Sequence, residues 1–179
     1  MKRWAALLRG VNVGGRKLAM ADLRAMLAGM GFADVATLLA SGNATFSADA
    51  RDAATLEAAL ESESAKTLGL VTDYLVRDAA EIAEVMAANP FPEVAKTRPN
   101  QLIVMFHRDP FDTKMLDTLA SRYDGPERLR AIGRELYIDF PDGQGRSNLV
   151  PEMAKCKFPR VATGRNWNTV GKIAAQIGV

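Results

Sequence analysis

Two uninterrupted apolar segments constrain the fold of this chain more than any other sequence feature. They cover residues 4–8 and 102–106, and a short apolar run without polar alternation is typical of a β-strand that is buried on both faces. In both halves of the chain, such a run is followed by a helical pattern, a hairpin pattern, a second helical pattern and a further strand pattern. The repeated order predicts an α/β (α+β) chain made of two tandem units of similar plan.

In the first half, the predicted order of elements is β-α-β-β-α-β, which is the ferredoxin-like pattern. Apolar side chains recur at helical spacing from Leu23 to Met30, and Gly31 suits the end of that helix. Residues 43–48 alternate between apolar and polar side chains, as a half-buried strand does. After the strand at 4–8, the predicted elements are a helix at 20–30, strands at 35–40 and 43–48, a helix at 52–68 and a strand at 71–76.

The second half begins with a helix whose start is marked by Asp78 and Glu81, which have the spacing of a capping box. Two prolines end this helix within residues 89–92. The later elements are a strand at 102–106, a helix at 112–123, hairpin strands at 128–132 and 135–140, a helix at 149–157, a short strand at 160–163 and a helix after Asn166. We expect ferredoxin-like unit 1 over residues 1–77 and ferredoxin-like unit 2 with the C-terminal helix over residues 78–179, in one compact body.

The composition argues against several classes of protein. The chain has 179 residues with a single cysteine, Cys156, and a single histidine, His107, which cannot form a disulfide or the usual zinc site. We expect Cys156 to pack in a helix contact and His107 to be structural. No apolar run approaches the ~18 residues of a membrane helix, and the apolar run between Arg3 and Arg9 is too short for a signal peptide. We therefore expect a cytoplasmic protein with no membrane partner, no metal and no cofactor.

The net charge is only +2, but the charged side chains are unevenly distributed. Residues 1–21 contain five cationic side chains and no acidic one, and residues 146–179 contain six cationic side chains and one acidic one. Residues 49–93 contain ten acidic side chains and three cationic ones. If both termini lie on one face, that face would attract an anionic partner, whereas separated termini would give ordinary solvated surfaces.

Residues 9–17 join the first strand to the first helix and contain three glycines, three cations and no acid. Glycine lets backbone N–H groups approach a ligand closely, and a helix N-terminus attracts anions. The segment therefore predicts a cradle for a phosphate or a carboxylate. Its candidate ligand-binding residues are Arg9, Asn12, Gly14, Gly15 and Lys17. A glycine-rich turn with solvated cations is the alternative interpretation.

Two further polar clusters flank predicted strands or helix ends. In the first, Ser41 and Asn43 are candidate ligand-binding residues around a Gly42 turn. In the second, Arg165 can bind an anion, Asn166 can cap the last helix, and Trp167 can stack on a ligand or pack in the core. The candidate ligand-binding residues of this cluster are Arg165, Asn166 and Asn168. A plain helix start with Trp167 in the core is the alternative.

The combination of these motifs resembles a bacterial family, the domain of unknown function 1697. The resemblance covers nearly the whole chain, and it implies a cytoplasmic bacterial protein of duplicated ferredoxin-like build without an established activity. Thr37-Leu38-Leu39-Ala40 replaces the Thr-Tyr-Ile-Gln of the family pattern, and Gly164 replaces a threonine or similar residue. The matching segments are Leu8-Arg9-Gly10-Val11-Asn12-Val13-Gly14-Gly15, Met20-x-x-Leu23-Arg24, Gly31-Phe32, Ser41-Gly42-Asn43-x-x-Phe46 and Arg165-Asn166-Trp167-Asn168-Thr169-Val170.

Three functions remain open from the sequence. The first is a binding protein for a phosphate-bearing or other anionic ligand, either a small molecule or a nucleic acid, that uses the segment at residues 9–17. The second is an enzyme in which Asn and Ser side chains orient the substrate while Arg9 or Arg165 stabilises developing negative charge. The third is a protein interaction module in which the motif residues are structural. The sequence identifies no catalytic residue and no oligomeric state.

Overall fold

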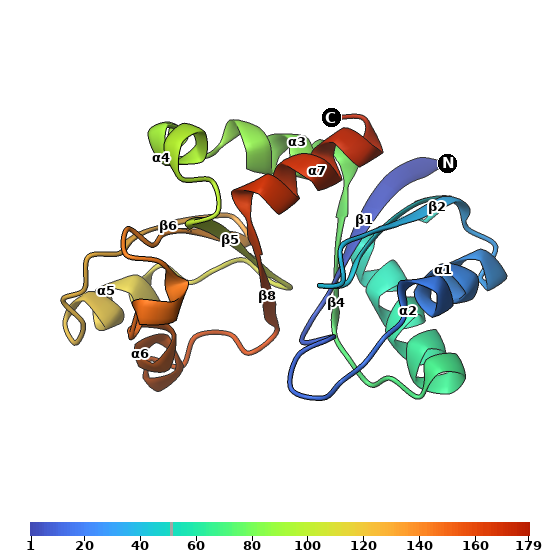
Figure 1. Ribbon diagram of the computed structural model, residues 1–179, viewed down its shortest axis with the longest axis horizontal. Helices are drawn as coiled ribbons and strands as arrows, with labels where there is room; N and C mark the ends of the chain where they lie inside the picture. The colour runs from blue at the N-terminus through green and yellow to red at the C-terminus, as the bar shows by residue number, and fades with distance from the viewer. Residues whose placement is uncertain (51) are drawn as a thin grey trace. The chain divides into compact units, whose positions relative to one another are not determined.

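The computed structural model describes residues 1–50 and 52–179 and divides the chain into two compact units (Figure 1). The first unit contains Met1–Ala87 and Gly171–Val179, and the second contains Ala88–Val170. The boundary between the units falls after Ala87, whereas the sequence predicts it after residue 77. The difference arises because the helix that follows Asp78 packs on strands of the first unit.

The first unit is a four-stranded antiparallel sheet with helices after β1, β3 and β4. The strands lie in the order β2-β3-β1-β4. The elements are β1 (Lys2–Leu8), α1 (Met20–Gly29), β2 (Ala33–Leu38), β3 (Asn43–Ala48), α2 (Ala53–Leu68), β4 (Tyr74–Asp78) and α3 (Ala79–Ala87).

The second unit repeats this plan with its strands in the order β6-β7-β5-β8. The elements are α4 (Pro92–Thr97), β5 (Leu102–His107), α5 (Lys114–Ala120), β6 (Arg128–Ile132), β7 (Glu135–Asp139), the 3-10 helix η1 (Gln144–Arg146), α6 (Leu149–Lys155) and β8 (Ala162–Asn166). The last helix, α7 (Trp167–Ile177), begins in the second unit and ends in the first. The predicted fold class, two tandem ferredoxin-like units, is confirmed.

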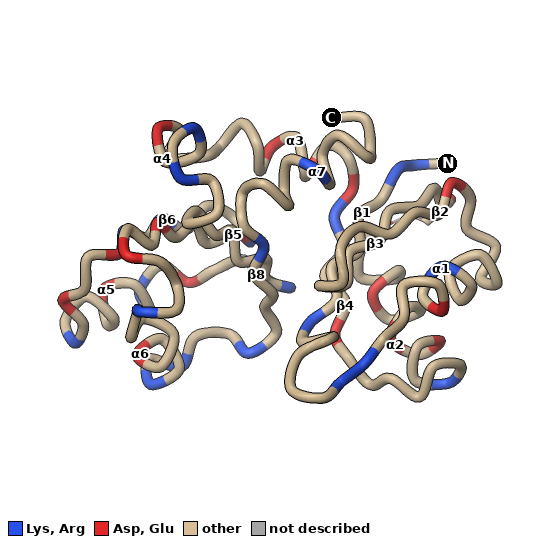
Figure 2. Tube along the Cα trace, in the orientation of Figure 1, with Lys and Arg blue, Asp and Glu red and all other residues tan. Residues whose placement is uncertain are grey.

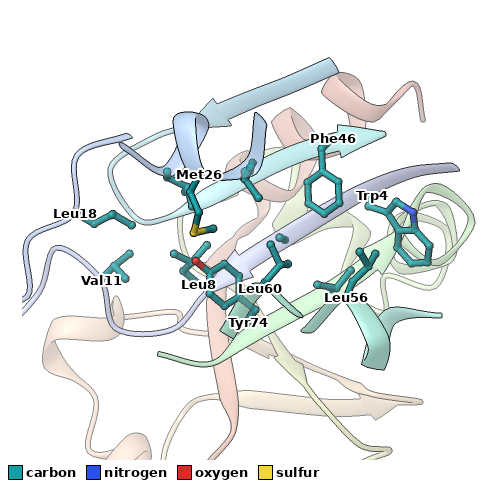
Figure 3. Close-up of a cluster of buried hydrophobic side chains, with 14 of the residues drawn as sticks. Trp4, Leu8, Val11, Leu18, Met26, Phe46, Leu56, Leu60 and Tyr74 are labelled. Carbon is teal, nitrogen blue, oxygen red and sulfur yellow. The ribbon is translucent and has the colours of Figure 1, made fainter. Parts of the chain in front are cut away.

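The apolar run at residues 4–8 lies in β1, one of the two inner strands of the first sheet, and it is buried on both faces as the sequence predicts. Trp4, Ala6 and Leu8 point into a core that also contains Phe46 and Leu60 (Figure 3). The intervening residues of the run, 5 and 7, are also fully buried. Burial on both faces explains why this strand carries no polar alternation.

The core of the second unit contains the apolar side of the predicted hairpin. Leu136, Ile138 and Phe140 share this core with Cys156, so the expected role of Cys156 as a packing thiol is confirmed. His107 is also buried, with Nδ1 3.3 Å from the carbonyl oxygen of Arg134. Its contacts agree with the expected structural role.

Strand β8 lies later in the sequence than the predicted strand at 160–163. It pairs with β5 from Ala162 to Asn166, so that Arg165 lies opposite Val104. A Cβ at Gly164 would lie 3.2 Å from both Ile103 and Met105. Residues 164–166 have no β-forming side chains, and the pairing with β5 overrides their weak strand propensity.

Helix α4 is absent from the sequence prediction, which treats residues 89–92 only as a helix stop. Helix α3 already ends at Ala87, and Pro92 begins α4, because a proline at the first helical position loses no hydrogen bond. The predicted capping box of α3 is confirmed. The Glu81 N–H donates to Asp78 Oδ1 and the Asp78 N–H donates to Glu81 Oε2, both at 2.9 Å.

Across residues 1–50 and 52–179, no helix has both the length and the apolar character needed to span a bilayer.

Candidate anion-binding site

The Asn12 side chain shapes the loop between β1 and α1. Its Nδ2 donates to the carbonyl oxygens of Leu18 at 3.1 Å and Ala40 at 2.6 Å, and its Oδ1 accepts from the Leu18 N–H at 2.9 Å. Asn12 has φ +54°, a conformation that asparagine adopts more readily than most residues. Asn12 therefore closes the loop on itself and holds it against the turn between β2 and β3.

The turn between β2 and β3 packs tightly against the same loop. The Leu8 N–H donates to the carbonyl oxygen of Gly42 at 2.9 Å. Gly42 has φ +80°, and a Cβ there would lie 2.4 Å from Cγ2 of Val11 and 2.9 Å from Cβ of Leu8. Only glycine fits this contact.

Asn43 is fully buried beside this turn. Its Nδ2 donates to the carbonyl oxygen of Leu38 at 2.8 Å and to Ser41 Oγ at 3.0 Å. The structure thus brings together two of the three polar clusters, residues 9–17 and residues 41–43. In both, the asparagine amide is bound to backbone carbonyl groups.

The three cations of the loop have different surroundings. Arg9 Nη1 lies 3.1 Å from Asp73 Oδ2, so its charge is largely balanced. The Arg16 guanidinium donates a hydrogen bond to the carbonyl oxygen of Val71. Lys17 is exposed and makes no ion pair within the described part of the chain.

A cavity of about 580 Å³ lies beside this loop at the start of α1. We call it the loop groove; it is lined by Asn12, Gly15, Arg16, Lys17, Leu18, Ala19 and Ala40. Two of these residues are cationic and none is acidic. Ala19 is the N-cap residue of α1 and offers no side-chain acceptor to the first N–H groups of the helix. A neighbouring cavity also contains Lys17 but has Asp22 and Glu63 in its walls, which makes it less suited to an anion.

The third polar cluster belongs to the second unit. Arg165 is buried in β8, and its Nη1 donates to Thr163 Oγ1 at 2.7 Å and to the carbonyl oxygen of Gly164 at 2.8 Å. Burial lowers the pKa of Arg165 to about 10, so the guanidinium is still protonated at neutral pH.

The start of α7 contains the other residues of this cluster. Asn166 caps the helix, since its Oδ1 accepts from the N–H and the hydroxyl of Thr169, both at 3.0 Å. Asn168 is exposed and donates to Asn100 Oδ1 at 2.7 Å. Trp167 is half-buried at the start of α7, so it is less buried than the alternative interpretation expects, whereas the helix start of that interpretation is present.

Besides the three polar clusters, the structure contains a further group of polar side chains that has no recognisable motif in the sequence. In the second unit, Tyr123 donates to Glu127 Oε2 at 2.9 Å, and the Ser147 hydroxyl donates to Glu127 Oε1. These side chains border a cavity of about 430 Å³. Only glycine fits at position 125 beside these side chains, because a Cβ there would lie 2.3 Å from the Tyr123 ring. Ser147 lies 20 residues beyond Glu127, so the sequence gives no local signal that joins it to this cluster.

The arrangement in the loop groove can attract an anion through two cations and a helix N-terminus. Among residues 1–50 and 52–179, no group of three or more His, Cys, Asp or Glu side chains is arranged to hold a metal ion.

Two antiparallel sheets of the same strand order, each with helices in the ferredoxin-like positions, define a duplicated α/β protein. The sequence pattern of the family described as "Protein of unknown function (DUF1697)" matches residues 1–137, and the chain belongs to this family. A solved structure described as the conserved bacterial protein SP0830 from Streptococcus pneumoniae is similar over the whole chain. The two chains are 25% identical with a TM-score of 0.75, and the match covers 100% of this chain and 99% of that one. No curated protein sequence matches significantly.

Proposed function

We propose that this protein binds a phosphate-bearing or other anionic ligand, such as a nucleotide or nucleic acid, in the loop groove of its first unit. The observation that carries the proposal is that Arg16 and Lys17 border a cavity without an acidic side chain at the N-terminus of α1. Fixed cations and the positive end of the helix dipole both favour negative charge at this place.

The hydrogen bonds of the loop support the proposal because they fix its shape before a ligand arrives. Asn12 binds backbone groups of its own loop and of the neighbouring turn. Cβ atoms at Gly14 and Gly15 would meet nothing within 4 Å, so the backbone there is open to solvent. A site that is already ordered loses less conformational entropy on binding.

Within this proposal the candidate residues have different roles. Lys17 and Gly15 contact the ligand together with Arg16, whereas Asn12 and Asn43 hold the backbone around it. Arg9 contributes little, because Asp73 balances its charge. We also propose that the protein acts in the cytoplasm, since its lone cysteine has no use as a disulfide.

The proposal is tested by thermal unfolding in the presence of inorganic phosphate, pyrophosphate, a nucleoside triphosphate and a short oligonucleotide. A ligand at ~100 times its Kd stabilises by about 2.7 kcal/mol, and each kcal/mol raises Tm by roughly 2–4 °C at this size. We expect at least one probe to raise Tm, and we expect added salt and Lys17→Gln to reduce the effect.

Lys114→Gln is the matched control, because Lys114 is an exposed lysine at a helix start in the second unit. This variant should respond to the probes as the unmodified protein does. Equal responses of the Lys17→Gln and Lys114→Gln variants, or a flat response to every probe, would show that the loop groove is not an anion site.

An interaction module with structural motif residues is the second candidate function. It is favoured by the asparagine contacts, since Asn12, Asn43 and Asn166 all bind groups of their own chain. This candidate predicts that substitutions of these residues change only stability. A variant of full stability that has lost its ligand response would contradict it.

A further inference from the structure

Three large apolar side chains are exposed on the loops around the loop groove. The exposed fractions are 61% for Val13, 46% for Leu39 and 75% for Val71. They come from three different connections: β1 to α1, β2 to β3, and α2 to β4. Exposed aliphatic side chains that gather in one region are typical of a contact surface.

Hydrogen bonds join these three loops to one another. The Asn12 side chain donates to the carbonyl oxygen of Ala40, next to Leu39, and the Arg16 guanidinium donates to the carbonyl oxygen of Val71 itself. The Thr72 hydroxyl donates to the carbonyl oxygen of Arg9 at 2.5 Å. We call the side chains of Val13, Leu39 and Val71 the apolar tips. Their loops are therefore joined to one another at one end of the first unit.

The same end of the unit is cationic. Arg9, Arg16 and Lys17 lie in the loop that carries Val13, and Figure 2 shows these cationic segments between β1 and α1. Asp73 pairs with Arg9, whereas Arg16 and Lys17 form no ion pair with any residue in 1–50 or 52–179. We call the surface formed by Val13, Leu39, Val71, Arg16 and Lys17 the tip surface.

Leu39 supplies a second observation at this surface. It has φ +60°, a left-handed conformation that is costly for leucine and that asparagine or glycine would adopt more easily. Because the Leu39 side chain is exposed, its burial in the fold contributes little free energy to offset this backbone strain. A strained residue with its side chain in solvent often marks a functional contact.

We propose that the tip surface docks on the surface of an anionic phospholipid bilayer. The apolar tips enter the interface between headgroups and acyl chains, while Arg16 and Lys17 attract the lipid phosphates. The loop groove would receive one lipid phosphate, so this inference rests on the proposed function and names its ligand. Leu18, Ala19 and Ala40 give the groove apolar walls that suit an amphiphilic anion.

Other partners fit the tip surface less well. Single-stranded nucleic acid is held by aromatic stacking, and every exposed large apolar side chain at this end of the unit is aliphatic. The strongest contacts of protein interfaces are enriched in Trp, Tyr and Arg, of which the tip surface has only Arg16, and Leu and Val are rare among them. Docking on a bilayer surface needs no spanning segment, so it is compatible with the lack of such a helix in the described residues. It departs from the expectation of no membrane partner, which considered only spanning helices and signal peptides.

The experiment is co-sedimentation of the full chain with vesicles of phosphatidylcholine alone and of phosphatidylcholine mixed with phosphatidylglycerol. We expect binding to the mixed vesicles only, with a decrease as salt is added. Lys17→Gln should weaken this binding about fivefold, which corresponds to one cation near an anionic surface. Lys114→Gln should leave it unchanged.

Leu39→Asn is the sharper variant, because asparagine suits the left-handed backbone and should keep or raise Tm. It removes one apolar tip, so we expect binding to the mixed vesicles to fall on the order of tenfold. Val150→Asn is its control, since Val150 is an exposed valine in α6 of the second unit. Equal binding by the Leu39→Asn and Val150→Asn variants would overturn the inference.

The vesicle result and the anion result can be separated. If pyrophosphate raises Tm but vesicles are not bound, the docking surface is wrong and the proposed function stands. Binding of an oligonucleotide without binding of vesicles would likewise replace the lipid by a nucleic acid. If vesicles are bound while Lys17→Gln changes nothing, the tips act without the groove and the inference fails as stated.

Discussion

At the scale of the residue, asparagine side chains hold several turns of this chain in place. Asn12 binds three backbone groups, and Asn43 binds a carbonyl group and a serine hydroxyl. Asn168, by contrast, makes a single hydrogen bond to the side chain of Asn100 at an exposed position. The same residue type in three motifs therefore contributes unequally to stability.

We predict that Asn12→Ala lowers the free energy of unfolding by about 1–2 kcal/mol, because it removes the hydrogen bonds of the loop and places alanine at positive φ. Asn168→Ala should cost less than about 0.5 kcal/mol, since an exposed side-chain bond is replaced by water. Urea unfolding of the two variants measures the difference. Equal losses would show that the Asn12 contacts do not hold the loop.

At the scale of the element, local signals predict where helices begin better than where edge strands lie. Asp78 and Glu81 mark the start of α3 from sequence, and both hydrogen bonds of the capping box are present. Strand β8 has no such signal, because residues 164–166 are stabilised by pairing with β5 rather than by their own propensity. Residues 89–92 follow the end of α3 and contain Pro92, the first residue of α4. Local sequence rules alone do not tell a proline that stops a helix from one that begins the next.

Asn166 links β8 to α7, and its substitution tests the helix cap. We predict that Asn166→Ala costs about 1 kcal/mol of stability, because the Thr169 N–H loses its acceptor. Asn166→Asp keeps an acceptor at the same place and should be close to neutral. Thermal unfolding of both variants gives the comparison, and a loss of equal size in both would argue against a capping role.

At the scale of the whole molecule, the chain is two sheets of the same strand order. One face of each sheet packs against helices that follow its own strands, so each unit has a core of its own. Cys156 lies in the core of the second unit and is the lone thiol of the chain. Its reactivity therefore reports on the opening of that unit.

We predict slow reaction of Cys156 with a disulfide reagent in the native protein and complete reaction in urea, because the thiol is only 8% exposed. The rate should rise with urea before the unfolding midpoint only if the second unit opens locally. Rapid, complete labelling without denaturant would contradict the packing of Cys156 in this core.

The sequence by itself determined the duplicated ferredoxin-like plan, the order of the elements apart from α4, and the burial of the strand at residues 4–8 on both faces. These depend on apolar periodicity and capping residues, which act over a few neighbouring positions. It also indicated that residues 9–17 and residues 41–43 are candidate sites. Glycine and asparagine favour turns in both segments, and the cations of residues 9–17 attract anions.

Only the tertiary structure decided what these residues contact. It placed Arg9 against Asp73, and it paired the Asn12 amide with backbone groups of two loops. It also linked by hydrogen bonds the three loops that carry Val13, Leu39 and Val71. Residues that meet across three separate loops have no periodic relation in the sequence. Such contacts are fixed by the pairing of strands far apart in the chain, and local propensity cannot specify them.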